Sequence, residues 1–394
     1  MKSEWKTIRA ADFMDFNPRM CLKKGTVATK ISMDKLQPYT KKIPETEQAE
    51  FSGGTKFSNG DTIMARITPC LENGKTAFVD CLNKDEVAFG STEFIVLRAK
   101  SGVSDAQFVY YLATSPEFRQ VAIKSMVGSS GRQRVQQPVL ESLELVVPEL
   151  PEQKRIGEFL AAIDDKIALN AKINDNLEQQ AVTYFQELYI NNANPMWQIG
   201  TISDLGTVVG GSTPSKTKPE YYTNNGIAWI TPKDLSINKS KFISHGENDI
   251  TELGLKNSSA TVMPKGTVLF SSRAPIGYIA IASNEVTTNQ GFKSVIPYLE
   301  IGTAFVYFFL KHSLPVIESA ASGSTFKEIS GSAMKNIPAI IPDRSTLDQF
   351  NSFCAPIFAQ QKILEEQNHS LAMLRDSLLP KLMSGAIDIA SIQL

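Results

Sequence analysis

The sequence is poor in cysteine and histidine. Its 394 residues include four cysteines, none of them in a C-x-x-C pair, and three histidines. This composition argues against a disulfide framework and against a Cys/His zinc site, and it fits a reducing cytoplasm. The sequence also has no apolar leader at its start and no uninterrupted apolar run of roughly 18 residues, the length of a membrane span. We therefore expect a cytoplasmic protein with no membrane partner.

A large net charge is also absent, since the formal net charge is −1. The charges are nevertheless unevenly placed along the chain. Residues 1–150 hold 20 Lys/Arg against 18 Asp/Glu, and residues 191–345 hold 13 against 11. The other two segments are acidic, with 4 against 7 in residues 151–190 and 3 against 5 in residues 346–394. A polyanion is therefore expected to bind the first and third segments rather than the second and fourth.

Catalytic motifs are missing as well. No G-x-G-x-x-G loop, metal-ligand cluster or convincing Ser/His/Asp set is present. The string Asn73-Gly74-Lys75-Thr76 resembles the end of a phosphate loop, but Pro69 stands where that loop needs a glycine, so a hairpin turn is the better interpretation. Ser324-Thr325-Phe326-Lys327 fits S-x-x-K without its companion motifs. We predict a non-catalytic chain that binds no cofactor or metal. A phosphate-loop hydrolase is the least favoured of three possible functions, and the other two are binding functions without catalysis.

What the sequence does contain is an internal duplication. Residues 130–190 and 324–384 align without a gap at an offset of 194, since Pro148 matches Pro342 (342 − 148 = 194). The hydrophobic positions match too, so that Leu140 falls on Met334. A repeated unit of this size predicts two lobes related by pseudo-twofold symmetry, which suits a target with two halves.

Each copy of the repeat ends in a helical pattern. Mostly apolar residues recur at alternating steps of four and three from Ile156 to Leu188, and these positions form the seam of the predicted helix. The same seam recurs 194 residues later, from Phe350 to Leu382. This spacing predicts two long helices, the first from about Glu152 to Tyr189, that bury their seams against each other as an antiparallel coiled coil. Pro356 is expected to kink the second helix, and Pro380 and Gly385 to end it. The polar seam residues expected to fix the register are Asn170, Asn174, Gln361 and Asn368.

The remaining segments read as short strands with a few helices. In the first lobe, strands are predicted at Asp61–Ile67, Thr76–Val79, Phe94–Leu97 and Leu143–Val147, and equivalent helices at Ala106–Leu112 and Ala304–Leu310 of the two lobes. The fold class is thus α+β, with two mostly-β lobes separated by two long antiparallel helices. The predicted domains are residues 1–150, a first spacer helix at 151–190, residues 191–345, and a second spacer helix with a C-terminal tail at 346–394.

Polar and basic loops occupy equivalent places in the two lobes. Gly/Ser-rich segments with Arg and Gln cover residues 128–134, and a related segment covers residues 322–327. Arg can contact guanine and Gln adenine in the major groove, although such loops read alone are solvated turns. Arg66 and Arg273 are expected to be placed alike, each just before a hairpin. The predicted DNA-binding residues are Arg66, Lys75, Arg132, Gln133, Arg134, Lys216, Lys218, Lys233, Arg273, Asn289, Gln290, Lys293, Thr325 and Lys327.

Five strings taken together resemble a known family. They are GGSTPSKTKPEYY (210–222), IAWITPKDL (227–235), TNQGF (288–292), LPEQKRIGEFLAAIDDKI (150–167) and LLPKLMSG (378–385). They are similar to the specificity subunit of type I restriction-modification enzymes, over the whole length of the chain. The first lobe departs most, with MCLKKGTVATKISMDKL where the second lobe has its GGSTP and WITPKDL strings.

The resemblance implies that the two lobes are target-recognition domains, which recognise a bipartite site on double-stranded DNA. It also implies two modification subunits, which carry S-adenosylmethionine and methylate adenine, and restriction subunits, which use ATP and Mg²⁺ to translocate and cut DNA. This chain would supply only recognition and assembly. The alternative is a two-lobed, non-catalytic scaffold that binds protein or RNA.

Overall fold

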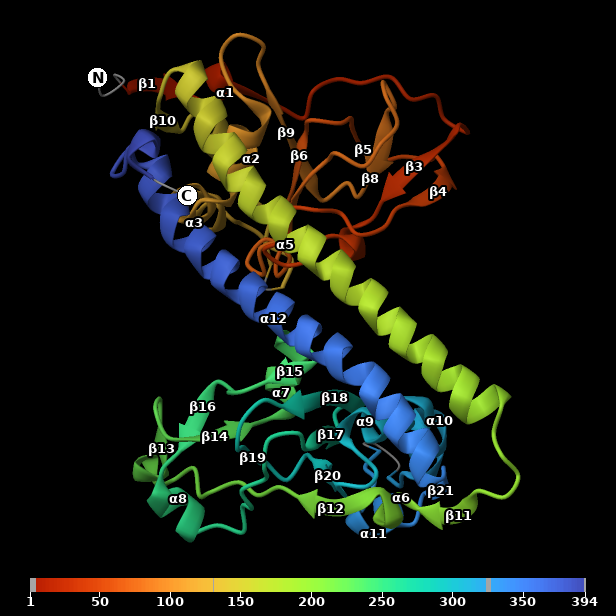
Figure 1. Ribbon diagram of the computed structural model, residues 1–394. Helices are drawn as coiled ribbons and strands as arrows, with labels where there is room; N and C mark the ends of the chain where they lie inside the picture. Colours follow the sequence, from red (N-terminus) through yellow and green to blue (C-terminus); the bar gives the residue numbers. More distant parts are fainter. Residues whose placement is uncertain (1–4, 130, 324–326, 393–394) are drawn as a thin grey trace. The chain divides into compact units, whose positions relative to one another are not determined.

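The computed structural model describes residues 5–129, 131–323 and 327–392. The chain divides into two compact units. Unit 1 consists of Met1–Leu169 and Asn368–Leu394, and unit 2 of Asn170–Gln367. Each unit combines a β-rich lobe with one half of each of two long helices, α5 (Leu150–Phe185) and α12 (Arg344–Met383) (Figure 1). Among the described residues, no helix is long and apolar enough to cross a membrane.

The two helices pack against each other in antiparallel direction within each unit. In unit 1, Leu160 of α5 shares a core with Leu379 and Leu382 of α12. In unit 2, the rings of Tyr184 and Phe353 lie 4.3 Å apart. Both helices bury their seam against the partner helix and their own lobe, as the heptad pattern predicts. The predicted helix pair is confirmed.

The polar seam residues contact the partner helix through amide groups. In unit 1, Asn368 Nδ2 donates to the carbonyl of Ile167 at 3.2 Å. In unit 2, Gln361 Nε2 donates to the carbonyl of Asn174 at 3.1 Å, and Asn170 Nδ2 donates to Gln367 Oε1 at 3.3 Å. A shift of one helix along the other would break these bonds inside the seam, so the contacts support a role in fixing the register.

The ends of α12 only partly follow the sequence prediction. Gly385 ends it as expected: this residue has φ 68° and its N–H donates to Leu382 O at 3.3 Å. The prediction that Pro380 ends the helix is wrong, since the helix runs on to Met383. The last turn is held by burial, because Leu382 is fully buried in the core of unit 1, and this compensates for the missing proline N–H. Helical structure also continues through Pro356.

The lobe of unit 1 has three sheets, with strand orders β1-β10, β2-β9-β6-β7 and β4-β3-β8-β5. Phe108 and Tyr111 of α2 are buried against the core of this unit, and Asp105 caps the helix by accepting from Phe108 N at 3.0 Å. The elements are β1 (Lys6–Arg9), α1 (Ala10–Phe13), β2 (Met14–Phe16), β3 (Val27–Ile31), β4 (Glu47–Glu50), β5 (Thr55–Phe57), β6 (Thr62–Ala65), β7 (Thr76–Phe78), β8 (Ala88–Gly90), β9 (Phe94–Ala99), α2 (Ala106–Thr114), α3 (Pro116–Lys124), α4 (Gln137–Glu141) and β10 (Glu144–Val147).

The lobe of unit 2 also has three sheets, β11-β21, β12-β20-β17-β18-β15 and β13-β16-β14-β19, of which the second has five strands where that of unit 1 has four. In the terminal pair, Lys6 faces Val147 in unit 1 and Gln198 faces Ile341 in unit 2. The elements are β11 (Gln198–Thr201), α6 (Ile202–Leu205), β12 (Gly206–Gly210), β13 (Tyr222–Thr223), β14 (Ile227–Ile230), α7 (Pro232–Ile237), β15 (Phe242–Ile243), β16 (Asn248–Ile250), α8 (Glu252–Lys256), β17 (Val268–Ser272), β18 (Ile276–Ala282), β19 (Thr287–Thr288), β20 (Lys293–Pro297), α9 (Thr303–His312), α10 (Leu314–Ala320), α11 (Gly331–Lys335) and β21 (Pro338–Ile341).

The predicted strands and helices of the lobes are all present, with ends that differ by about two residues or fewer. The Asn73-Gly74 turn lies between the antiparallel strands β6 and β7, and Gly74 has the φ of 72° that favours glycine. It opens no helix, so the hairpin interpretation is confirmed.

Candidate nucleic-acid interface

A Gly/Ser-rich loop, residues 128–133, begins and ends at a short bridge in unit 1. Val127 N donates to Arg134 O at 3.1 Å, and Arg134 N donates to Val127 O at 2.9 Å. The next residue, Val135, is fully buried and its N–H donates to Arg66 O at 2.8 Å. The base of this loop is thus fixed to the segment that leaves β6.

Unit 2 has the same bridge at the base of the loop of residues 323–327. Ser322 N donates to Glu328 O at 3.1 Å, and Glu328 N donates to Ser322 O at 2.9 Å. Ile329 is fully buried, and its N–H donates to Ser272 O at 3.1 Å. Arg134 and Glu328 therefore occupy equivalent positions, at the offset of 194 that the duplication predicts (328 − 134 = 194).

The prediction that Arg66 and Arg273 are placed alike is wrong by one residue. Arg66 N donates to Glu93 O at 2.9 Å, and the equivalent bond in unit 2 runs from Ser272 N to Gly291 O at 2.8 Å. Successive side chains of an extended chain point to opposite sides, so the two arginines face differently. Arg66 is half-buried, with Nη2 3.3 Å from Val135 O, whereas Arg273 reaches Glu328.

Both loop bases carry an ion pair, and its polarity differs between the units. In unit 1, Arg134 grips Glu93 with two nitrogens, with Nη2 2.6 Å from Oε1 and Nε 3.0 Å from both carboxylate oxygens. The hydrogen bond from Arg134 lowers the pKa of the Glu93 carboxyl below its ordinary value, which keeps it ionised. In unit 2 the acid is Glu328, on the loop side, with Arg273 Nη1 at 3.3 Å and Lys293 Nζ at 3.6 Å.

The predicted loop residues differ in exposure. Arg132 and Lys327 are exposed, whereas Gln133 is half-buried, and its carbonyl accepts from Thr68 N at 3.0 Å. Thr325 lies outside the described residues. Of the predicted residues in unit 1, the structure brings Arg66, Gln133 and Arg134 together at the loop base. Lys75 is tied elsewhere, because its Nζ donates to Met33 O at 2.9 Å.

In unit 2, two of the strings singled out in the sequence meet in space. Ser212 N donates to Thr288 O at 2.8 Å. A Cβ on Gly211 would clash with the carbonyl oxygens of Thr288 and Asn289, so only glycine permits this approach. Thr213 and Gln290 are hydrogen-bonded, and Asn289 Oδ1 accepts from Gly291 N at 2.8 Å. Asn289 and Gln290 thus lie beside the GGST segment.

Three predicted lysines of unit 2 belong to other parts of its surface. Lys216 and Lys218 are exposed, with Lys218 Nζ 5.3 Å from the centre of the Tyr221 ring. Lys233 is exposed and pairs with Glu247 at 2.6 Å. These side chains are accessible to phosphate, but the contacts do not join them to the loop base.

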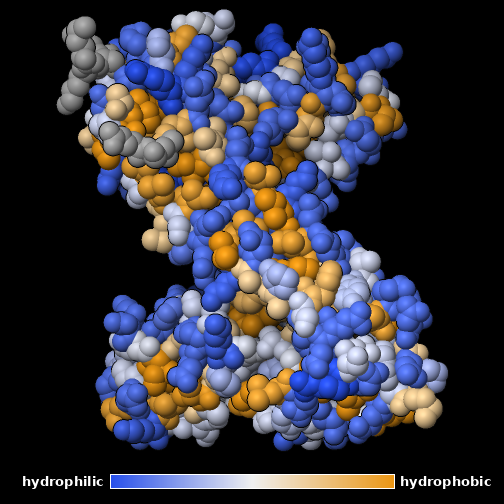
Figure 2. All heavy atoms as spheres, in the orientation of Figure 1, coloured by the Kyte–Doolittle hydropathy of each residue, from blue (hydrophilic) through white to orange (hydrophobic). Residues whose placement is uncertain are grey.

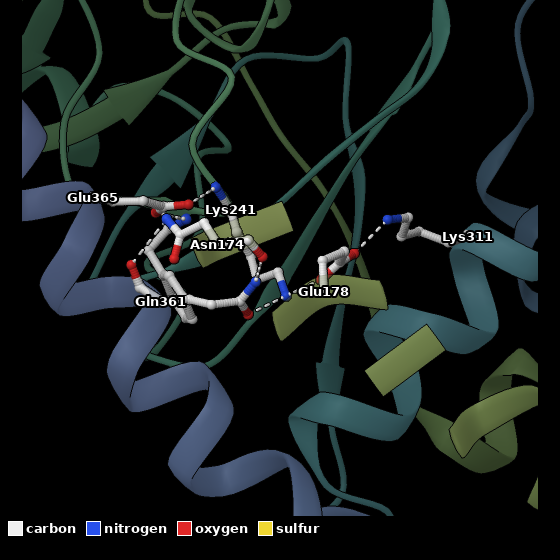
Figure 3. Close-up of polar contacts among 7 residues, drawn as sticks. Asn174, Glu178, Lys241, Lys311, Gln361 and Glu365 are labelled. Carbon is white, nitrogen blue, oxygen red and sulfur yellow. Dashed lines mark hydrogen bonds and ion pairs between the residues drawn. The ribbon is translucent and has the colours of Figure 1, made fainter. Parts of the chain in front are cut away.

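A buried lysine of unit 2 was missed by the sequence analysis. Lys241, just before β15, is 7% exposed, and its Nζ contacts Glu178 of α5 and, at 2.6 Å, Gln361 Oε1 of α12 (Figure 3). Its backbone N–H donates to Glu365 of α12 at 2.8 Å, and its Nζ lies 4.2 Å from the centre of the Phe358 ring. This one residue connects the lobe to both helices within unit 2.

The charges around Lys241 are balanced inside the cluster. Burial lowers the pKa of Lys241. Burial alone would raise the pKa of Glu178, but Lys241 and Lys311 together hold it below its ordinary value, and Lys311 Nζ lies 2.6 Å from Glu178 (Figure 3). A buried carboxylate with two ammonium partners stays charged, so the cluster is an ionic connection rather than a neutral one.

Unit 1 contains a related arrangement. Lys41 is 2% exposed and its Nζ lies 5.5 and 5.6 Å from the ring centres of Phe78 and Tyr111. Tyr111 donates to Asp164 of α5 at 2.5 Å, and Arg375 of α12 pairs with the same carboxylate at 2.6 Å. In each unit a buried lysine beside aromatic rings therefore lies where the lobe meets the helices.

The acids at the loop bases, Glu93 and Glu328, were also missed in the sequence, because nothing local in the sequence marks them.

Comparisons with known proteins agree with this architecture. The family model described as "Type I restriction modification DNA specificity domain" matches residues 2–179 and again residues 194–367. The MjaIX specificity subunit of Methanocaldococcus jannaschii is 39% identical over 193 residues, which is 47% of this chain and 44% of that protein. The HindI specificity subunit of Haemophilus influenzae is 24% identical over 407 residues, covering 84% of this chain and 87% of that protein.

A solved structure shares the fold. The type I restriction-modification S subunit from M. genitalium matches 96% of this chain and 96% of its own length, with 17% sequence identity and a TM-score of 0.56. The α+β fold with two β-rich lobes and two long helices is therefore confirmed, and so is the resemblance found in the sequence.

Proposed function

Because this chain belongs to the type I restriction modification DNA specificity domain family, we propose that it recognises a bipartite site on double-stranded DNA, one half with each lobe. The observation that carries this proposal is the recurrence of one loop base in both units, at Val127/Arg134 and at Ser322/Glu328. A shared scaffold with different side chains on each copy is what reading two unequal half-sites requires.

The chemistry belongs to other subunits in this proposal. The chain assembles with two modification subunits, which hold S-adenosylmethionine and methylate adenine. Restriction subunits, which use ATP and Mg²⁺, join the same cytoplasmic complex. The chain itself contributes recognition and assembly and carries no catalytic residue. Its similarity to the specificity subunits of other type I enzymes supports this division of labour.

The helices offer surface for those subunits. Large apolar side chains on α5 and α12 are exposed, including Leu169 at 52%, Ile363 at 47% and Met373 at 60%. Apolar side chains reach the surface along the helical segments in Figure 2. The acidic balance of residues 151–190 and 346–394 makes these helices poor partners for DNA phosphates, which favours protein contacts there.

Methylation mapping tests this function. In cells that carry the complete system, methylated adenines should define a motif with two half-sites, and deletion of this chain should abolish that methylation. Exchanging residues 191–345 for the same region of a relative should then change one half-site and leave the other. Methylation that persists without the chain, or a well-folded chimera in which both half-sites change, would contradict the proposal.

A further inference from the structure

The acids at the two loop bases have no role in the function proposed so far. We propose that Glu93 in unit 1 and Glu328 in unit 2 are specificity-determining positioning residues, which fix the recognition loops and withhold neighbouring cations from non-specific phosphate contact. This inference rests on the proposed DNA-binding function. Two carboxylates, and not only the lysines and arginines around them, thereby take part in recognition.

Each ion pair lies at the end of its loop. The backbone bridge that closes each loop includes one member of the ion pair itself, Arg134 in unit 1 and Glu328 in unit 2. The side-chain pair then joins this bridge to a second segment: Glu93 immediately precedes β9, and Lys293 begins β20. Each pair thus fastens the base of its loop to the strands beneath it.

The cations of the pairs are accessible from the surface. The side chain of Arg134 is 45% exposed and that of Arg273 is 38% exposed, so both can reach a phosphate placed at the loop base. Phosphate contacts raise the affinity for any DNA sequence equally and carry no information about the bases. A cation that is already paired with a carboxylate must give up that partner to contact a phosphate, so it contributes less to non-specific binding.

The polarity of the ion pair is reversed between the two units. The same position carries the cation in unit 1, Arg134, and the acid in unit 2, Glu328, while Gly291 replaces Glu93 as the residue before the buried phenylalanine. Only the position shared by Arg134 and Glu328 carries a member of the pair in both units, and its partners come from different positions. An ion pair at the loop base therefore recurs although the sign of the shared residue and the place of its partner differ. The acid restrains one cation in unit 1 and two in unit 2, Arg273 and Lys293.

The test compares Glu93→Gln and Glu328→Gln in the complete complex. Glutamine keeps the shape of the side chain and removes the charge. The matched control is Glu47→Gln, which breaks an exposed pair with Lys30 at 2.7 Å on strands β3 and β4 of the same lobe. All three pairs are partly exposed, and breaking such pairs costs little folding stability, so each variant should remain folded by circular dichroism.

Two readouts decide the outcome. Binding to a duplex without the methylation motif should tighten, and its dependence on salt should steepen by about one counterion in Glu93→Gln and by up to about two in Glu328→Gln. Methylation mapping should show relaxed recognition of one half-site in Glu93→Gln and of the other half-site in Glu328→Gln. Glu47→Gln should match the wild type in both measurements.

A charge exchange separates positioning from simple loss of a residue. The double variant Glu93→Arg with Arg134→Glu rebuilds the unit 1 pair with the polarity of unit 2, and it should restore the wild-type salt dependence. If the single variants match Glu47→Gln, or bind unrelated duplex more weakly, the inference is wrong. If the wild-type chain itself directs no bipartite methylation, the proposed function fails instead, so the two failures are distinguishable.

Discussion

Arg132 and Arg134 are two residues apart in one loop, and the structure gives them different surroundings. Arg134 is held by Glu93 in a bidentate pair, while Arg132 is exposed beyond the bridge that closes the loop. In the sequence alone, the two arginines are equivalent candidates for base contacts. Their environments now favour Arg132 as the side chain that reaches a base edge and Arg134 as the one that anchors the loop.

We expect Arg132→Ala to weaken binding to the target duplex by about 1–3 kcal/mol and to relax recognition at one half-site only. The cause is the loss of hydrogen bonds to a base edge, which no other residue of the loop replaces in kind. Competition binding with duplexes that differ in a single half-site measures the effect. Lys124→Ala, an exposed cation on α3 of the same unit, serves as the control. Equal relaxation at both half-sites would refute the assignment.

The cations of the site could be predicted from the basic loops in the sequence, but the carboxylates that pair with them could not. Glu93 lies 41 residues before Arg134 in the chain, and only the fold brings them together. The one-residue error in matching Arg66 with Arg273 has a similar cause. Both arginines precede a proline, but strand alternation decides which side a residue faces, and the sequence alone does not place the alternation.

At the scale of elements, the helices were the most predictable part. A seam that repeats over ten positions has a period that only a helix satisfies, so the existence and pairing of α5 and α12 followed from the sequence. Proline predicted the end of α12 less well. Pro380 lacks one hydrogen bond, yet buried Leu382 and Met383 beyond it hold the last turn, which shows packing overriding a local signal.

The burial and ion pairing of Lys241, just before β15, could not be predicted from the sequence around it. Its partners Glu178 and Gln361 lie 63 and 120 residues away, and the sequence around it looks like an exposed loop. Two effects of opposite sign meet here: removing the ammonium group relieves its desolvation, but it leaves part of the charge of Glu178 uncompensated. Breaking one side of a buried ion pair usually costs more than it gains.

We therefore expect Lys241→Met to lower the unfolding free energy of unit 2 by about 3 kcal/mol, at the lower end for a broken buried pair because Lys311 still faces Glu178. Denaturant unfolding measures this through the fluorescence of Trp197 and Trp229, in a Trp5→Phe background so that only unit 2 reports. Lys265→Met, at an exposed lysine of the same unit, is the control. A loss no larger than that of the control would show that an apolar side chain serves equally well at this position.

At the scale of the whole molecule, the duplication predicted more than any single motif did. It indicated two lobes of one topology, and the recurrence of the terminal strand pair and of the loop base bears this out. It could not indicate which side chains differ in role between the copies. A duplicated backbone preserves hydrogen bonds between main-chain atoms, whereas the side chains at Arg134 and Glu328 have opposite charges on the same scaffold.

The division into units falls inside the helices. Unit 1 ends at Leu169 and resumes at Asn368, so the only covalent links between the units run through α5 and α12. If each lobe reads its own half-site, the length of these helices sets the number of unspecified base pairs between the half-sites.

Inserting four residues near Asn174 and four near Asn368 adds about one turn, or roughly 6 Å, to each helix. Since DNA rises about 3.4 Å per base pair, the methylated motif should keep both half-sites and gain one or two unspecified base pairs between them. Affinity should also fall, because four residues exceed one turn of 3.6 and rotate one unit against the other. Methylation mapping reads the spacing directly. The same four residues inserted beside Leu299, a 98% exposed residue of unit 2, should leave the spacing unchanged. An active helix variant with the original spacing would show that α5 and α12 do not set the distance between the half-sites.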